Sequence, residues 1–294
     1  MSQAFESQAR AERVAARLPP LTVAAERLAT AVAQGIHGRR RVGPGTTFWQ
    51  FRPYEPGDPV HRIDWRRSAK ADPVFVRERE WEAAARVWLW RDASPSMVYR
   101  SRRGLPLKRE RAELLLLALA SLLVRGEEQV GLLGTDETTL GGAPGLERLS
   151  LALAAERSGT MAGEMPRPPH LPRFARVILL GDFLGPTAEI EADLKRYAGW
   201  NAQLHLLLIV DPAEESLPFS GRIRFEGLEG EGTVLINRVD SVRAAYIERM
   251  RTRRLFLAET ARRLGGTFHI HRTDSSPEAA LLDLYSALSL HRDG

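Results

Sequence analysis

The stretch that decides the fold begins with an apolar run, Arg86-Val87-Trp88-Leu89-Trp90-Arg91, and continues Asp92-Ala93-Ser94-Pro95-Ser96-Met97. The first half has the length and character of one buried strand. The second half changes to oxygen-bearing side chains at alternate positions, and Pro95 cannot continue a sheet ladder. Because open α/β sheets bind ligands at the carboxyl ends of their strands, this transition is typical of a site at the edge of such a sheet.

The polar half offers one carboxylate and two hydroxyls, from Asp92, Ser94 and Ser96. These are hard oxygen ligands of the kind that Mg²⁺ prefers. The same residue types are also common in turns for purely local reasons. From these residues alone the two interpretations stand level, so the remainder of the chain must decide between them.

Downstream of this stretch, apolar strands alternate with helical patterns. Strands are expected at residues 86–91, 129–133, 175–180, 203–210 and 267–271, and helices at 108–124, 146–156, 188–197, 240–264 and 277–290. This alternation predicts an α/β fold for residues 85–294, with a doubly wound, mostly parallel sheet and helices on both faces. A hairpin insertion is expected near residues 221–237.

The part of the chain before residue 85 has a different character. Residues 1–20 are polar and charged and are expected to form a flexible lead. Residues 21–84 are expected to hold an N-terminal helix and a small irregular or β-rich lobe. Within that lobe, prolines and glycines exclude a long helix, while the aromatic residues and the paired Arg and Asp residues argue against disorder.

The composition excludes several classes of site. The 294 residues include no cysteine, so disulfides, thiolate zinc sites and cysteine nucleophiles are ruled out. The most apolar segment, residues 112–124, is too short to span a bilayer, so a cytoplasmic protein without a membrane span is expected. The net charge of +5 allows weak attraction to acidic partners or nucleic acid without identifying either.

Acidic residues follow three of the expected strands, at Asp92, Asp182 and Asp211. Neighbouring parallel strands place such ends along one edge of the sheet, so Asp182 is expected beside Asp92. A Mg²⁺ or Mn²⁺ ion held by Asp92, Ser94 and Ser96, with Asp182 bound directly or through water, is chemically sensible. Such a site leaves coordination positions open for water or for a carboxylate from another molecule.

The pattern Asp92-x-Ser94-x-Ser96 after an apolar strand, followed later by a strand ending in Asp182, resembles the von Willebrand factor A (vWA) domain. The resemblance implies a metal-ion-dependent adhesion site (MIDAS) that also uses a threonine from a second loop. Thr160 is the candidate for that threonine, with Thr138 and Thr139 behind it.

The preceding segment is similar to the signature of a bacterial family called domain of unknown function 58. Its residues are Phe51-Arg52-Pro53-Tyr54-Glu55-Pro56-Gly57-Asp58, then Arg62-Ile63-Asp64-Trp65 and Ser68-Ala69. In that family the segment directly precedes an A-type domain, and the resemblance covers roughly residues 30–290.

The two resemblances together imply a non-enzymatic, metal-dependent protein-interaction module. They imply a MoxR-type AAA+ ATPase as partner, in the assembly or remodelling of other protein complexes, with an acidic group of a partner completing the metal site. The signature side chains form either a second contact surface or an internal network that fixes the lobe: Arg52, Tyr54, Asp58, Arg62, Asp64 and Trp65.

Two other functions are the alternatives. A metal-dependent hydrolase or phosphatase could keep its nucleophile at Asp92, but Asp92-Ala93-Ser94 lacks a second acid two residues on. A nucleic-acid-binding protein would explain the clustered arginines, but aromatic residues are not interleaved with them for base stacking. The seven histidines show no spacing typical of a metal site or a catalytic triad.

Overall fold

The computed structural model describes residues 20–39, 49–54, 63–69, 74–79, 84–156, 165–167 and 171–290. These residues fall into two compact units. A main unit contains the described residues from 20 to 35 and from 85 onward, and a small unit lies between residues 36 and 84. The expected flexible lead falls almost wholly outside the described residues.

The main unit is built on a five-stranded parallel sheet in the order β4-β3-β5-β6-β9. The strands are β3 (Arg86–Arg91), β4 (Gln129–Leu132), β5 (Arg176–Gly181), β6 (Gln203–Val210) and β9 (Thr267–Arg272). The predicted α/β fold with a parallel sheet is confirmed. The chain runs from β3 outward to β4 and then returns past β3 to β5, so the strand order reverses between β3 and β5. Ligands of doubly wound sheets bind at this reversal.

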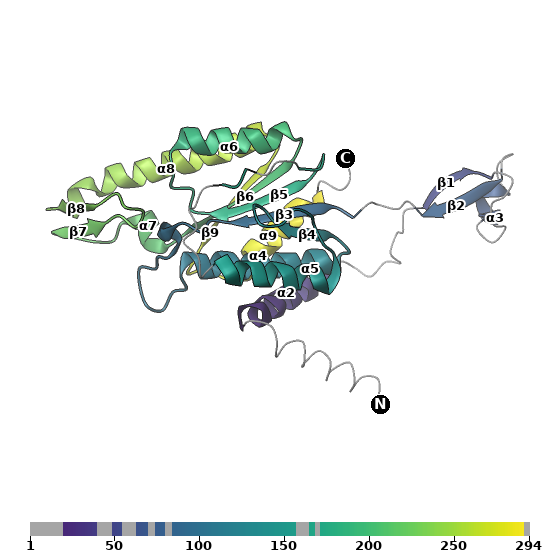
Figure 1. Cartoon of the computed structure of the whole chain (residues 1–294), viewed down its shortest axis with the longest axis horizontal. Helices are drawn as coiled ribbons and strands as arrows, with labels where there is room; N and C mark the ends of the chain where they lie inside the picture. Colours follow the sequence, from purple (N-terminus) through teal and green to yellow (C-terminus); the bar gives the residue numbers. More distant parts are fainter. Residues whose placement is uncertain are drawn as a thin grey trace, which may run out of the picture. The chain divides into compact units, whose positions relative to one another are not determined.

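Helices cover both faces of the sheet (Figure 1). One face carries α6 (Thr187–Gly199) and α8 (Val239–Arg263), which contact each other. The other face carries α4 (Lys108–Arg125), α5 (Gly142–Glu156) and α9 (Pro277–Leu290), and α4 packs against both of the others. This double cover explains why β3 reads as a continuous apolar run. Trp88 and Trp90 join the core on the α6 side, and Val87 and Leu89 alternate to the opposite face.

Helix α2 (Pro20–Arg39) packs on the main unit as far as Gly35. The Thr22 hydroxyl lies 2.7 Å from that of Ser150 in α5, and Arg125 of α4 pairs with Glu26 at 2.5 Å. From the sequence this helix was expected to belong with the lobe that follows it, and the observed division differs. The reason is that helical periodicity predicts a buried face without identifying the surface that covers it.

The small unit is the β-rich lobe that the sequence predicts. Strands β1 (Trp49–Pro53) and β2 (Phe75–Arg79) pair antiparallel, and α3 (Trp65–Ser68) forms one turn between them. An isolated bridge from Ile63 to Val76 extends the pairing.

Three shorter features complete the main unit. A 3-10 turn, η2 (Pro95–Met97), follows β3, and α7 (Pro212–Ser216) follows β6. The hairpin of β7 (Ile223–Glu226) and β8 (Thr233–Ile236) lies within the expected insertion. Among the described residues, no helix has both the length and the apolar character needed to cross a membrane.

Candidate functional site

Asp92 stands immediately beyond the last residue of β3 and is buried. Its amide donates to the carbonyl of Leu180 at 2.7 Å, which continues the β3–β5 pairing by one more bond. Its Oδ1 accepts the amide of Ser94 at 2.8 Å, which holds the turn into η2. Gly181 makes this approach possible, because a Cβ at that position would lie 2.8 Å from Cβ of Asp92. The end of β5 is therefore shaped around the Asp92 side chain.

A chain of hydrogen bonds joins Asp92 to the end of β5. The hydroxyls of Ser94 and Ser96 lie 2.9 Å apart. The Ser96 hydroxyl donates to Oδ2 of Asp182 at 2.7 Å. Four of the five predicted metal ligands thus meet at the point where the strand order reverses. The fifth, Thr160, lies outside the described residues.

A lysine that the sequence does not predict lies at the edge of the site. Nζ of Lys108, the first residue of α4, donates to Oδ2 of Asp182 at 2.8 Å and to Oε1 of Glu214 at 2.5 Å. Lys108 is fully buried. In the sequence, Lys108 belongs to a run of basic residues, which are usually solvated, so no signal distinguished it from Arg109 and Arg111.

Asp211, the third acid at a strand end, has a structural role. Its Oδ1 accepts the amide of Ala213 at 2.8 Å and caps α7, and its Oδ2 accepts the amide of Ser101 at 2.9 Å. The amide of Asp211 in turn donates to Oε2 of Glu214 at 2.8 Å. This reciprocal capping box fixes Glu214 where Lys108 can reach it.

Burial and neighbouring acidic residues disfavour the ionised form of Asp92. Burial first, and then the nearby charges of Asp182 and Glu229, raise the pKa of Asp92 to about 7, against hydrogen bonds from Ser94 that lower it. Burial also lowers the pKa of Lys108, but the charges of Asp182 and Glu214 outweigh it, and the net pKa is raised. The lysine is therefore a fixed ammonium that pairs with Asp182 and Glu214.

The site opens into a cavity of about 440 Å³. Asp92, Ser94 and Asp182 form part of its wall, and the hairpin tip contributes Leu228 and Glu229. Two carboxylates and two hydroxyls form an all-oxygen donor set, which fits Mg²⁺ or Mn²⁺. Within the described part of the chain, no group of three or more His, Asp or Glu residues could hold a metal ion. The candidate centre would therefore rest on two carboxylates, the serines and water.

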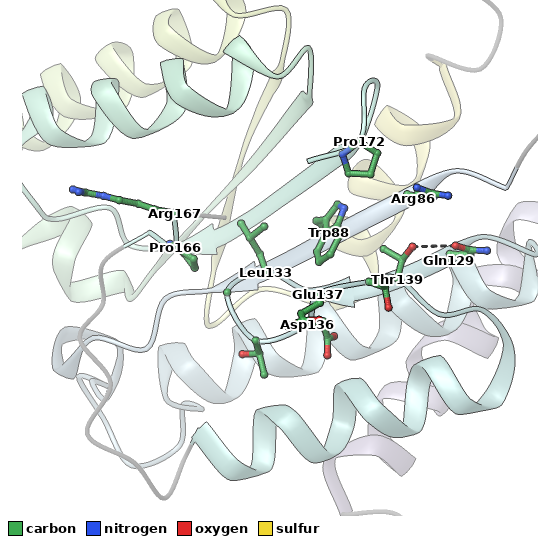
Figure 2. Close-up of a pocket in the computed structure, with 13 residues that line it drawn as sticks. Arg86, Trp88, Gln129, Leu133, Asp136, Glu137, Thr139, Pro166, Arg167 and Pro172 are labelled. Carbon is green, nitrogen blue, oxygen red and sulfur yellow. Dashed lines mark hydrogen bonds between the residues drawn. The ribbon is translucent and has the colours of Figure 1, made fainter. Parts of the chain in front are cut away.

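A second cavity, of about 750 Å³, lies beside β4 (Figure 2). Trp88, Leu133 and Pro166 line it, and the Thr139 hydroxyl donates to Gln129 at 3.0 Å. Thr138 and Thr139, the reserve candidates for the loop threonine, line this cavity and do not line the one at Asp92. Met165 and Leu171, from the segment that precedes β5, join Trp88 and Trp90 in the core on this face.

The signature residues lie in the small unit. The Tyr54 amide donates to the Val74 carbonyl at 2.7 Å. Asp64 is buried, and its carbonyl accepts both the amide and the hydroxyl of Ser68. Trp65 is 63% exposed, which suits a contact surface. Asp58 and Arg62 lie outside the described residues.

Residues 50–255 match the family described as "Protein of unknown function DUF58". The chain belongs to this family. Its relatives include uncharacterized protein Rv1480 of Mycobacterium tuberculosis and uncharacterized protein Mb1516 of Mycobacterium bovis. Each is 24% identical over 282 residues, which cover 89% of this chain and 86% of the relative.

Among solved structures, the chain is similar to the conserved hypothetical protein BatB from Bacteroides thetaiotaomicron, with 16% identity and a TM-score of 0.42. It is also similar to an aerotolerance-related membrane protein from Bacteroides fragilis, with 14% identity and a TM-score of 0.40. Each match covers 70% of this chain and 100% of the other. Likenesses this distant assign no function.

Proposed function

We propose that this DUF58 protein is a non-enzymatic, metal-dependent interaction module of the vWA type. Asp92, Ser94, Ser96 and Asp182 would hold Mg²⁺ or Mn²⁺, with Thr160 as a further ligand. The observation that supports this most is the single hydrogen-bonded network of the first four residues, three of which (Asp92, Ser94 and Asp182) line a cavity.

When bound, the metal would supply a positive centre that attracts an acidic group of a partner protein. Asp92 supplies the negative charge that the metal neutralises, and the two serines supply neutral oxygens. The Lys108 ammonium pairs with Asp182 at 2.8 Å and fixes that carboxylate in place. Apolar side chains, Trp90 and Ile190 among them, also line the cavity, and surroundings of lower dielectric strengthen charge interactions.

The proposed partner is a MoxR-type AAA+ ATPase, which the resemblance to the family implies. The small unit would provide a second contact surface, and the exposure of Trp65 supports that role. Aromatic residues such as tryptophan commonly carry much of the binding energy of an interface.

The partner hypothesis is tested by measuring binding to a purified MoxR-type ATPase in Mg²⁺ and in EDTA. We expect Asp92→Asn to weaken binding in Mg²⁺ at least about tenfold, and EDTA to weaken wild-type binding similarly, because the charge that attracts the partner is lost in both cases. Glu137→Gln is the matched control, because Glu137 is an exposed acid that lines the other cavity. Equal affinity for wild type and Asp92→Asn would show that the site does not govern association.

A further inference from the structure

Lys108 is a wholly buried lysine at the edge of the candidate metal site, and lysine is almost never buried without a charged partner. Its amide donates to the Tyr99 carbonyl at 3.1 Å, which fixes the start of α4. The side chain runs inward, and Nζ lies 5.9 Å from the centroid of the Tyr99 ring. A long flexible side chain is thus held in one place, which indicates a role for its charge.

The ammonium of Lys108 joins two elements that follow neighbouring strands. It pairs with Asp182 at 2.8 Å after β5 and with Glu214 at 2.5 Å in α7. Oδ2 of Asp182 also accepts the Ser96 hydroxyl at 2.7 Å, so this oxygen already has two donors. The other oxygen, Oδ1, accepts the Leu184 amide at a longer 3.3 Å.

We propose that the Lys108 ammonium is a built-in counter-ion of the site that competes with a divalent cation for Asp182 and so keeps metal affinity low. This inference rests on the proposed function, because it concerns the same metal site. A metal ion that reaches Asp92 and the serines meets a carboxylate whose Oδ2 the lysine and Ser96 already occupy. It also meets the repulsion of a nearby positive charge, which the buried setting screens poorly.

The consequence is a link between metal binding and α7. A divalent cation that takes over Asp182 weakens the hold of that carboxylate on Lys108, which leaves Glu214 as the lysine's main partner. Glu214 also accepts the Asp211 amide, and its carbonyl accepts the Tyr246 hydroxyl of α8 at 2.9 Å. Through Glu214, the lysine therefore connects metal binding at the site to helices α7 and α8.

The test is isothermal titration calorimetry of the full chain with MgCl₂. We expect Lys108→Met to bind Mg²⁺ at least about tenfold more tightly than wild type, because a nearby positive charge is gone. Glu214→Gln is expected to bind Mg²⁺ more weakly, because Lys108 then pairs with Asp182 alone. Arg103→Met, which removes an exposed cation from the preceding loop, is the charge-matched control and should leave the affinity within about threefold of wild type.

The outcomes separate this inference from the proposed function. If wild type binds Mg²⁺ and Lys108→Met binds no more tightly, the inference is overturned while the metal site stands. If Lys108→Met binds and wild type does not, the inference is supported and metal dependence of the natural protein is contradicted. If neither binds, both are overturned. Should Lys108→Met fail to fold, tighter Mg²⁺ binding by Glu214→Gln than by wild type would overturn the inference.

Discussion

At the scale of single residues, the site depends on how closely β5 approaches Asp92. Gly181 ends β5 beside Asp92, and nothing larger than its hydrogen fits there without movement. At the nearby Gly185, by contrast, an added Cβ would meet no atom of the described residues within 4 Å. A methyl group added at Gly181 would therefore clash with Asp92, whereas one added at Gly185 would meet no neighbour among the described residues.

Gly181→Ala is expected to displace Asp92 and to weaken Mg²⁺ binding at least about tenfold, with a loss of about 1–3 kcal/mol of folding stability from overpacking. Gly185→Ala should change neither quantity appreciably. Calorimetric Mg²⁺ titration and thermal unfolding of the two variants measure both effects. Equal Mg²⁺ affinities in the two variants would mean that the approach of Gly181 does not position Asp92.

The sequence predicts Asp92, Ser94, Ser96 and Asp182 because two general rules apply to them. Alternate polar residues after an apolar strand mark a strand end, and parallel strands share one edge. Lys108 could not be predicted, since its partners Asp182 and Glu214 lie 74 and 106 residues away. A local sequence pattern carries no information on contacts between residues so far apart in the chain.

At the scale of elements, a buried ion pair joins α4 to β3. Nε of Arg91 lies 3.1 Å from Oε1 of Glu113, and both side chains are at most 1% exposed. The pair holds the helix that carries Lys108 against the strand that precedes Asp92. The pair thus adds to the apolar packing that places these two elements, and hence the site.

Glu113→Gln is expected to destabilise the fold by about 3–5 kcal/mol, because it removes the counter-charge that Glu113 supplies to the buried Arg91 guanidinium. The double variant Arg91→Met/Glu113→Leu should recover most of that loss, since an apolar pair removes both charges. Chemical denaturation measures the free energies of unfolding, with Glu147→Gln on the exposed side of α5 as control. A loss below about 1 kcal/mol for Glu113→Gln would contradict this role of the pair.

The bounds of the helices and strands agree with the predicted ones in some elements and differ in others. The strands at 86–91 and 203–210 are found at the predicted residues. Helix α5 begins at Gly142, before the predicted start at residue 146, because Pro144 is acceptable in a first helical turn. Helix α7 was not predicted, although Asp211 as its cap and Pro212 as its first residue are start signals for a helix.

At the scale of the whole molecule, a buried histidine links stability to pH. Burial lowers the pKa of His271 to about 4, and the charge of Arg111 adds to the decrease, against the opposing charge of Asp274. In the unfolded chain the pKa returns to the ordinary value of about 6.5. Between these values the unfolded state binds more protons, so acid favours unfolding.

Above about pH 6.5, we therefore expect His271 to cause no loss in the free energy of unfolding. As the pH falls from about 6.5 to about 4, protonation of His271 in the unfolded chain should lower that free energy by up to about 3 kcal/mol. His271→Phe should lose this part of the acid sensitivity while the decline from other groups persists. Urea denaturation of wild type and variant across the range from about pH 7.5 to about pH 4 provides the comparison. Parallel pH profiles for the two proteins would refute a buried neutral His271.

The doubly wound architecture follows from the alternation of strands and helices, but two of its features do not. The order of the strands depends on which crossovers the chain takes, and local patterns carry no information on that choice. The cover over Trp88 and Trp90 includes Met165 and Leu171, which come from an irregular segment without a periodic signal. The packing of α2 on α4 and α5 likewise depends on tertiary contacts, which local sequence patterns do not predict.

The most direct test of the central claim is paramagnetic broadening by Mn²⁺ in the ¹⁵N NMR spectrum of the full chain. We predict that substoichiometric Mn²⁺ first broadens the amide signals of Ser94, Ser96 and residues 181–184, and that Asp92→Asn abolishes this selective broadening. Broadening centred elsewhere, or the same pattern in Asp92→Asn, would contradict a metal site formed by Asp92, Ser94, Ser96 and Asp182.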